Sequence, residues 1–180
     1  MSDIPQTIKS VSEIHMAGVI ALVTAVISAI GVVLLIAMFA LFATQQSELG
    51  NRVGWLNDIC VALQYLLTIP IALALYRILS AYNPLLIRIA TILGIVSMLI
   101  VAGLQLLLIF KVLTFEQQVL WVSLAMILGV GSWLLVTGLA ARSTNRLPNS
   151  LLMSILAVPY IGYPVWTFWI GLQLLGWISL

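Results

Sequence analysis

Charged side chains are the scarcest feature of this sequence. Asp, Glu, Lys and Arg make up only 7% of its 180 residues, against about 25% in soluble domains. Hydrophobic residues reach 63%, and the mean hydropathy is +1.24. This composition excludes a water-soluble fold. The net charge of +2 is also too small to form a basic surface, so no nucleic-acid partner is expected.

Cysteine and histidine occur once each, as Cys60 and His15. One cysteine cannot form an internal disulfide or a redox pair, and one histidine cannot build a His-pair haem or a multi-His metal site. Ionisable side chains are also missing from the middle of the apolar stretches, which disfavours ion-coupled transport and nucleophilic catalysis. The sequence therefore predicts no catalytic residue, no cofactor and no metal.

Long apolar segments dominate what is present. They predict an all-α integral membrane bundle in which one transmembrane domain, 16–180, follows a polar segment at 1–15. About 20 apolar residues cross a bilayer, which gives five spans, at about 16–43, 58–79, 85–111, 119–141 and 150–180. The stretch 44–57 is predicted to be the longest loop.

Prolines predict irregularity in two of these spans. Pro70 predicts a kink in the second span, and Pro159 and Pro164 predict kinks in the fifth, because proline lacks the N–H that an interior helical residue donates. The last segment can be one long kinked helix, or 150–158 can be a separate interfacial helix that precedes a shorter span.

Basic residues predict the orientation, because cytoplasmic loops carry the excess of Lys and Arg. With five spans the N-terminus lies inside and the C-terminus outside. Trp55, Trp121 and Trp177 then all fall at the outer boundary, where indoles favour the headgroup region. The basic residues of the inner side are Lys9, Arg77, Arg88, Arg142 and Arg146, against Arg52 and Lys111 on the other.

Three glutamines lie at matching distances from the outer ends of the predicted spans. Gln64 follows Asp58 by six residues, Gln105 precedes Lys111 by six, and Gln173 lies seven from the C-terminus. At 1.5 Å per residue they would meet about 9–10 Å inside the boundary. This glutamine layer is either a polar pocket that opens outward beneath Asn57 and Asp58, or a set of hydrogen bonds that holds helices together.

Two further helix faces are candidate contact surfaces. In the first span a packing face recurs every fourth residue, as small residues do where membrane helices approach closely. It consists of Ala17, Ala21, Ala25 and Ala29. In the fifth span an aromatic face is formed by Tyr163, Trp166 and Trp169. That face could line a site for an apolar or lipid-like ligand, dock on a partner subunit, or simply face lipid. Gly129 and Gly131 favour close helix packing around Trp133.

Two segments carry a resemblance. Gly54-Trp-Leu-Asn-Asp58 through Tyr76-Arg77-Ile-Leu79, together with 160–171 (YIGYPVWTFWIG), resembles small uncharacterised bacterial membrane proteins of five or six spans. The resemblance implies a multi-pass protein of a bacterial cytoplasmic (inner) membrane. It implies no activity and no site residues.

The sequence therefore predicts a non-enzymatic protein of the lipid bilayer, acting as an accessory or scaffolding subunit or as a homo-oligomer. Its partners would be other membrane subunits or further copies of itself, recognised through lateral helix surfaces. The alternative is a small transporter or binding protein for an apolar or lipid-like molecule, and an intramembrane enzyme is the third hypothesis.

Overall fold

A computed structural model gives the fold, and it describes residues 6–81, 83–144, 147, 149–157 and 162–177. The regular structure of these residues is all helical. The elements are α1 (Gln6–Ala43), α2 (Ser47–Leu79), α3 (Pro84–Ile109), α4 (Phe115–Ala125), a π-helix η1 (Met126–Gly131), α5 (Ser132–Ser143), α6 (Ser150–Ala157) and α7 (Tyr163–Leu174). The prediction of an all-α bundle is therefore confirmed for the described residues.

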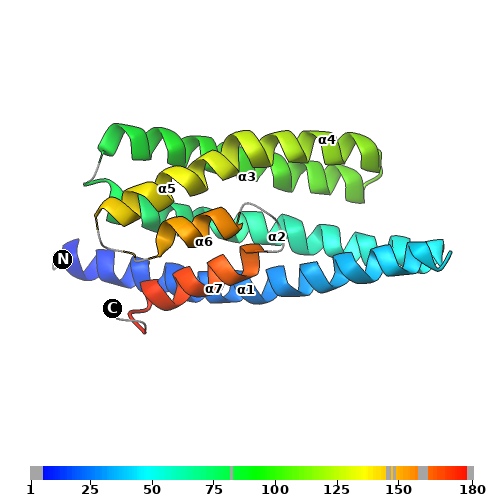
Figure 1. Ribbon diagram of the computed structural model, residues 1–180, viewed down its shortest axis with the longest axis horizontal. Helices are drawn as coiled ribbons and strands as arrows, with labels where there is room; N and C mark the ends of the chain where they lie inside the picture. The colour runs from blue at the N-terminus through cyan, green and yellow to red at the C-terminus, as the bar shows by residue number, and fades with distance from the viewer. Residues whose placement is uncertain (1–5, 82, 145–146, 148, 158–161, 178–180) are drawn as a thin grey trace, which may run out of the picture.

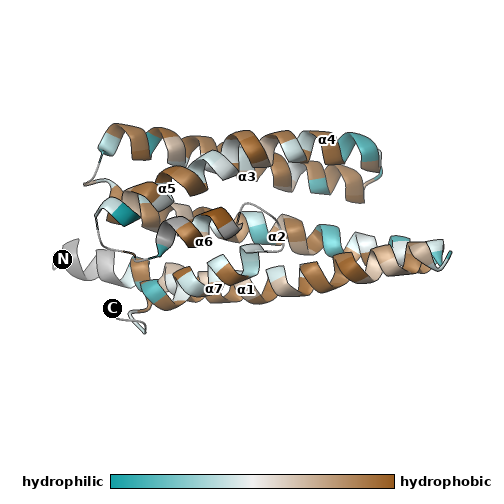
Figure 2. Cartoon of the chain, in the orientation of Figure 1, coloured by the Kyte–Doolittle hydropathy of each residue, from teal (hydrophilic) through white to brown (hydrophobic). Residues whose placement is uncertain are grey.

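Four helical stretches are long and apolar enough to cross a membrane: Ser12–Ala43, Ser47–Leu79, Pro84–Ile109 and Phe115–Ser143. They lie side by side as two antiparallel pairs (Figure 1). The fourth stretch is formed by α4, η1 and α5 in succession. Hydrophobic residues cover most of every helix, and hydrophilic residues gather at helix ends and at a few positions along α2 (Figure 2).

Helix ends are set by local capping chemistry. The Asn83 side chain accepts a hydrogen bond from the backbone N–H of Leu86, and Pro84 stands in the first turn of α3, where its missing N–H costs nothing. Thr114 and Gln117 form a reciprocal capping box at the start of α4. The connections from α2 to α3 and from α3 to α4 are short, and these three helices are antiparallel neighbours.

The predicted loop at 44–57 is much shorter in the structure, because α2 already begins at Ser47. Glu48 and Arg52, one helical turn apart, form a 2.7 Å ion pair there, a spacing that supports an exposed helix. The polar residues of this stretch therefore belong to a polar first part of α2 and not to a loop.

The predicted fifth span at 150–180 takes a different form. The chain folds into α6 and α7, of 8 and 12 residues, each shorter than the roughly 20 residues that cross a bilayer. The two helices run in opposite directions and cover only part of the length of the bundle (Figure 1). We call α6 and α7 the short hairpin. Pro164 lies in the first turn of α7 and not at a kink, while Pro159 lies outside the described residues.

The short hairpin brings the described chain ends together. The side chains of Leu174 and Leu175 lie against Gly18 of α1, and Gly171 lies against Leu22, so α7 runs antiparallel to α1. The end of α7 is consequently at the end of the bundle where α1 begins (Figure 1), and Trp177 follows Leu174, the last residue of α7, by three residues. The expectation that the two ends lie on opposite sides, with Trp177 beside Trp55, does not hold in the structure.

Candidate functional site

The candidate site lies where α7 begins, near the middle of α2. Tyr163, the first residue of α7, is fully buried, and its hydroxyl oxygen lies 2.6 Å from the Oγ1 of Thr68. Thr68 has one hydroxyl proton, which it donates to the carbonyl of Gln64 at 2.7 Å. Tyr163 must therefore be the donor toward Thr68, and the lone pairs of its own oxygen remain available as acceptors.

Aromatic contacts extend from Tyr163 on both sides. Its ring centroid lies 5.9 Å from that of Tyr65 and 5.5 Å from that of Trp166, and Trp166 meets Trp133 edge-on at 5.7 Å. The Tyr65 hydroxyl donates to the sulfur of Met126 at 2.7 Å. This central cluster, Tyr65, Trp133, Tyr163 and Trp166 with Thr68 and Met126, joins α2, η1, α5 and α7.

The π-helix η1 lies at the same level as this cluster. A π-helix is rare and frequently marks a functional site. Gly129 is buried against α3, where a Cβ atom would overlap the side chain of Ser97. The expectation that these glycines serve close packing is thus supported at Gly129, and α3 and η1 cross without room for a methyl group.

Gln64 lies one turn before Thr68 on the same face of α2 and is 0% exposed. Neither its Nε2 nor its Oε1 atom has a hydrogen-bond partner among the described residues. An unpaired amide in an apolar interior costs about 1–3 kcal/mol or more. This carboxamide is therefore a buried donor and acceptor that can bind a further molecule.

Ser28 of α1 lies level with Gln64. The glycines of α2 give the register, since Gly54 faces Met38 of α1. Ten residues further along each antiparallel helix, Gln64 and Ser28 are at the same level. Ser28 is 1% exposed, and its Oγ atom also has no partner among the described residues.

The structure does not bring the predicted glutamine layer together. Gln105 lies opposite Asn57, since these residues are 21 and 22 positions from the turn between Leu79 and Pro84. That is seven residues, or about 10 Å, from the level of Gln64. Gln173 lies between Gly171 and Leu175, which places it opposite Ile20 of α1, about 12 Å from Gln64 in the other direction.

Asn57 and Gln105 are themselves buried, and an amide oxygen of each has no partner in the described part of the chain. Asp58, next to Asn57, is half-buried. The Nε2 atom of Gln173 is also unpartnered. The five polar residues of the predicted pocket are thus distributed along the bundle, with Gln64 in the middle.

The packing face is used inside the molecule. Ala17, Ala21 and Ala25 are buried at 3%, 0% and 5% exposure, where α1 meets α2 and α7, while Ala29 is exposed. The aromatic face is internal as well. Tyr163 and Trp166 are buried in the central cluster, and Trp169 is half-buried. Neither face is directed to lipid as a whole.

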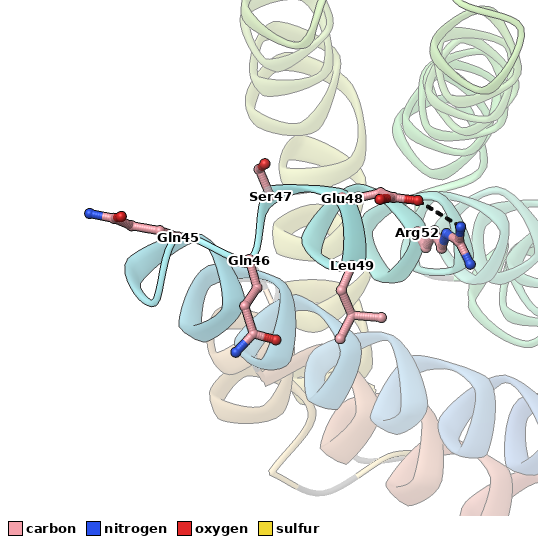
Figure 3. Close-up of a pocket in the computed structure, with 6 residues that line it drawn as sticks. All are labelled: Gln45, Gln46, Ser47, Glu48, Leu49 and Arg52. Carbon is pink, nitrogen blue, oxygen red and sulfur yellow. Dashed lines mark hydrogen bonds and ion pairs between the residues drawn. The ribbon is translucent and has the colours of Figure 1, made fainter.

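The turn between α1 and α2 holds a shallow, open hollow. Gln45, Gln46 and Ser47 line it together with the exposed pair Glu48 and Arg52, and Gln45 points away from the other side chains (Figure 3). Its side chains are all exposed, so no buried polar group is directed into it. No three His, Cys, Asp or Glu side chains gather as metal ligands in the described part of the chain.

Comparison with protein families, curated proteins and solved structures finds no match for this chain. The function of the chain is therefore inferred from the chemistry of the site itself.

Proposed function

We propose that this chain is a non-enzymatic membrane transporter or binding protein for a small molecule, with its site at Gln64. The observation that supports this is the wholly buried Gln64 side chain with both polar atoms unpartnered. Gln64 lies one turn before Thr68, which contacts Tyr163, the first residue of the short helix α7. A carboxamide without a partner in an apolar interior is costly, and a bound molecule that hydrogen-bonds to it would offset that cost.

The packing and aromatic faces count less as docking surfaces than the sequence suggested. Ala21 and Trp166 contact other helices of the same chain, so these faces hold the short hairpin onto the bundle. The function in transport or binding is supported better than recognition of partners by these two faces.

An accessory or scaffolding subunit, or a homo-oligomer, is the second candidate. It is favoured by α4, in which Gln118 is buried and the residues around it are largely exposed, Phe115 and Trp121 among them. Beside α4, Gly103 of α3 has no atom within 4 Å of the position that a Cβ would take. A second helix could pack closely there.

We further propose a topology of four spans and a short hairpin, with both described ends on the cytoplasmic side of a bacterial inner membrane. Arg77, Arg88 and Arg142 all belong to this end, at the end of α2, the start of α3 and the end of α5. Arg77 also forms an ion pair with Glu13 of α1.

Cysteine labelling tests this topology. In a Cys60→Ala background, we expect Trp177→Cys and Ser80→Cys to react with an impermeant maleimide from the same side of the membrane. Ser47→Cys should react from the opposite side. If Trp177→Cys reacted from the same side as Ser47→Cys, the last segment would cross the membrane as a fifth span, and the short hairpin would be wrong.

Purification from native membranes in mild detergent tests the function. We expect mass spectrometry to find no protein companion at stoichiometric amounts, and calorimetry to show that the purified chain binds a small molecule supplied in the buffer. A Gln64→Leu variant should lose this binding, whereas Gln46→Leu, an exposed glutamine at the start of α2, should retain it. A stoichiometric protein companion in both variants would favour the accessory subunit instead.

A further inference from the structure

We infer that the site at Gln64 accepts a small uncharged molecule, of the size class of water, formamide or urea, that both donates and accepts hydrogen bonds. This inference depends on the proposed transport function and specifies its substrate class.

The available hydrogen-bonding atoms determine the chemistry of the ligand. Gln64 offers two N–H donors and a carbonyl acceptor, and Ser28 offers a hydroxyl that can do both. The Tyr163 oxygen adds an acceptor, since its own proton is directed at Thr68. A molecule with only acceptors or only donors would leave part of this set unpaired.

Charge excludes ions as the ligand. Along α2 the nearest charged side chains are Asp58 and Arg77, six and thirteen residues from Gln64, or about 9 and 20 Å along the helix. An ion held among neutral carboxamide and hydroxyl groups would lack a counter-charge in a medium of low dielectric constant, which is very costly. A neutral molecule meets no such cost.

Close helix crossings limit the size of the ligand. On one side of the site, a methyl group at Gly54 would lie 2.8 Å from the sulfur of Met38. On the other side, one at Gly171 would lie 2.7 Å from Leu22. Both distances are shorter than carbon contacts allow, so α1 lies tightly against α2 and α7. A large molecule therefore cannot fit between α1 and its neighbours at these two levels.

Further polar groups continue from Gln64 toward both ends. Toward the α1–α2 turn, Asn57 and Gln105 present unpartnered amide oxygens about 10 Å away. Toward the other end, a cavity of about 10 Å³ lies between α2, α5, α6 and α7, with Thr137 and Ser154 in its wall. This is close to the smallest space that holds one water molecule. Polar groups that can pair with a small molecule are therefore present at further levels of the bundle on both sides of Gln64.

Permeability of proteoliposomes tests the inference. Stopped-flow light scattering would measure the flux of water, formamide and urea into vesicles that contain the purified full chain. We expect at least one of the three to cross several-fold faster than in protein-free vesicles. Gln64→Leu should return that flux to the protein-free level, and Gln46→Leu should leave it unchanged.

Ser28→Ala tests the same site in case Gln64→Leu fails to fold. It removes one hydroxyl and changes the side-chain volume little. We expect it to lower the flux several-fold while circular dichroism stays that of the native chain.

Equal flux with and without protein for all three probes would overturn the inference, as would full flux through a folded Gln64→Leu or Ser28→Ala variant. If a larger apolar molecule nevertheless copurifies and is lost in Gln64→Leu, the substrate class is wrong and the proposed function survives. A protein companion with no flux would contradict both.

Discussion

Trp166→Ala is expected to destabilise the protein by about 3–5 kcal/mol, the range measured for large aromatic residues in packed cores. Trp166 is 2% exposed, and its ring contacts both Trp133 and Tyr163. Alanine would remove both ring contacts and leave a cavity between α5 and α7. Reversible unfolding in mixed SDS micelles, followed by circular dichroism, measures the loss.

Phe168→Ala is the matched control, on the same helix two residues away. Phe168 is 52% exposed, so its replacement should change the free energy of unfolding by no more than about 0.5 kcal/mol. Equal losses in the two variants would contradict the position of α7, because both aromatic residues would then be equally exposed.

Gly129→Ala is expected to destabilise the protein by about 1–3 kcal/mol, as overpacking does in close-packed interiors. The new methyl group would overlap Ser97 of α3, so α3 and η1 would have to separate at the level of the central cluster. A second change, Ser97→Gly, removes the overlapping side chain and should recover part of the loss. Thermal unfolding in detergent measures both variants.

Gly103→Ala controls for the effect of glycine itself. Gly103 lies in α3, where a methyl group would meet nothing within 4 Å. Alanine is a better helix former by about 1 kcal/mol, so this variant should be as stable as the parent or more stable. If Gly129→Ala behaved in the same way, α3 and η1 would not cross closely.

The first four predicted spans correspond to long apolar helices, because hydropathy over about 20 residues measures the ability to cross a bilayer directly. The start of α2 could not be predicted from hydropathy, since Glu48 and Arg52 continue the helix beyond the apolar zone. The segment 150–180 was also ambiguous. Its length and lack of charge suit a span, whereas tertiary contacts with α1 determine that it folds back.

The residues of the site were predicted more completely than their arrangement. Gln64 was predicted from its depth, and Tyr163 as a member of the aromatic face. The glutamine layer assumed that each helix ends where charge begins, and α2 violates this assumption by more than two turns. Ser28, Tyr65 and Met126 were missed because serine, tyrosine and methionine are ordinary in apolar helices. Only the register between helices shows where these residues meet.

The contact between α1 and α7 has a consequence for biosynthesis. Ribosomes add about 5–20 residues per second, so α7 is made roughly ten seconds after α1. During that interval the surface of α1 around Gly18 and Ala21, which α7 later covers, is open. Neither α6 nor α7 is long enough to integrate as a span by itself. In the proposed topology the four spans therefore act as the template on which the short hairpin packs, and closure of the bundle follows membrane integration.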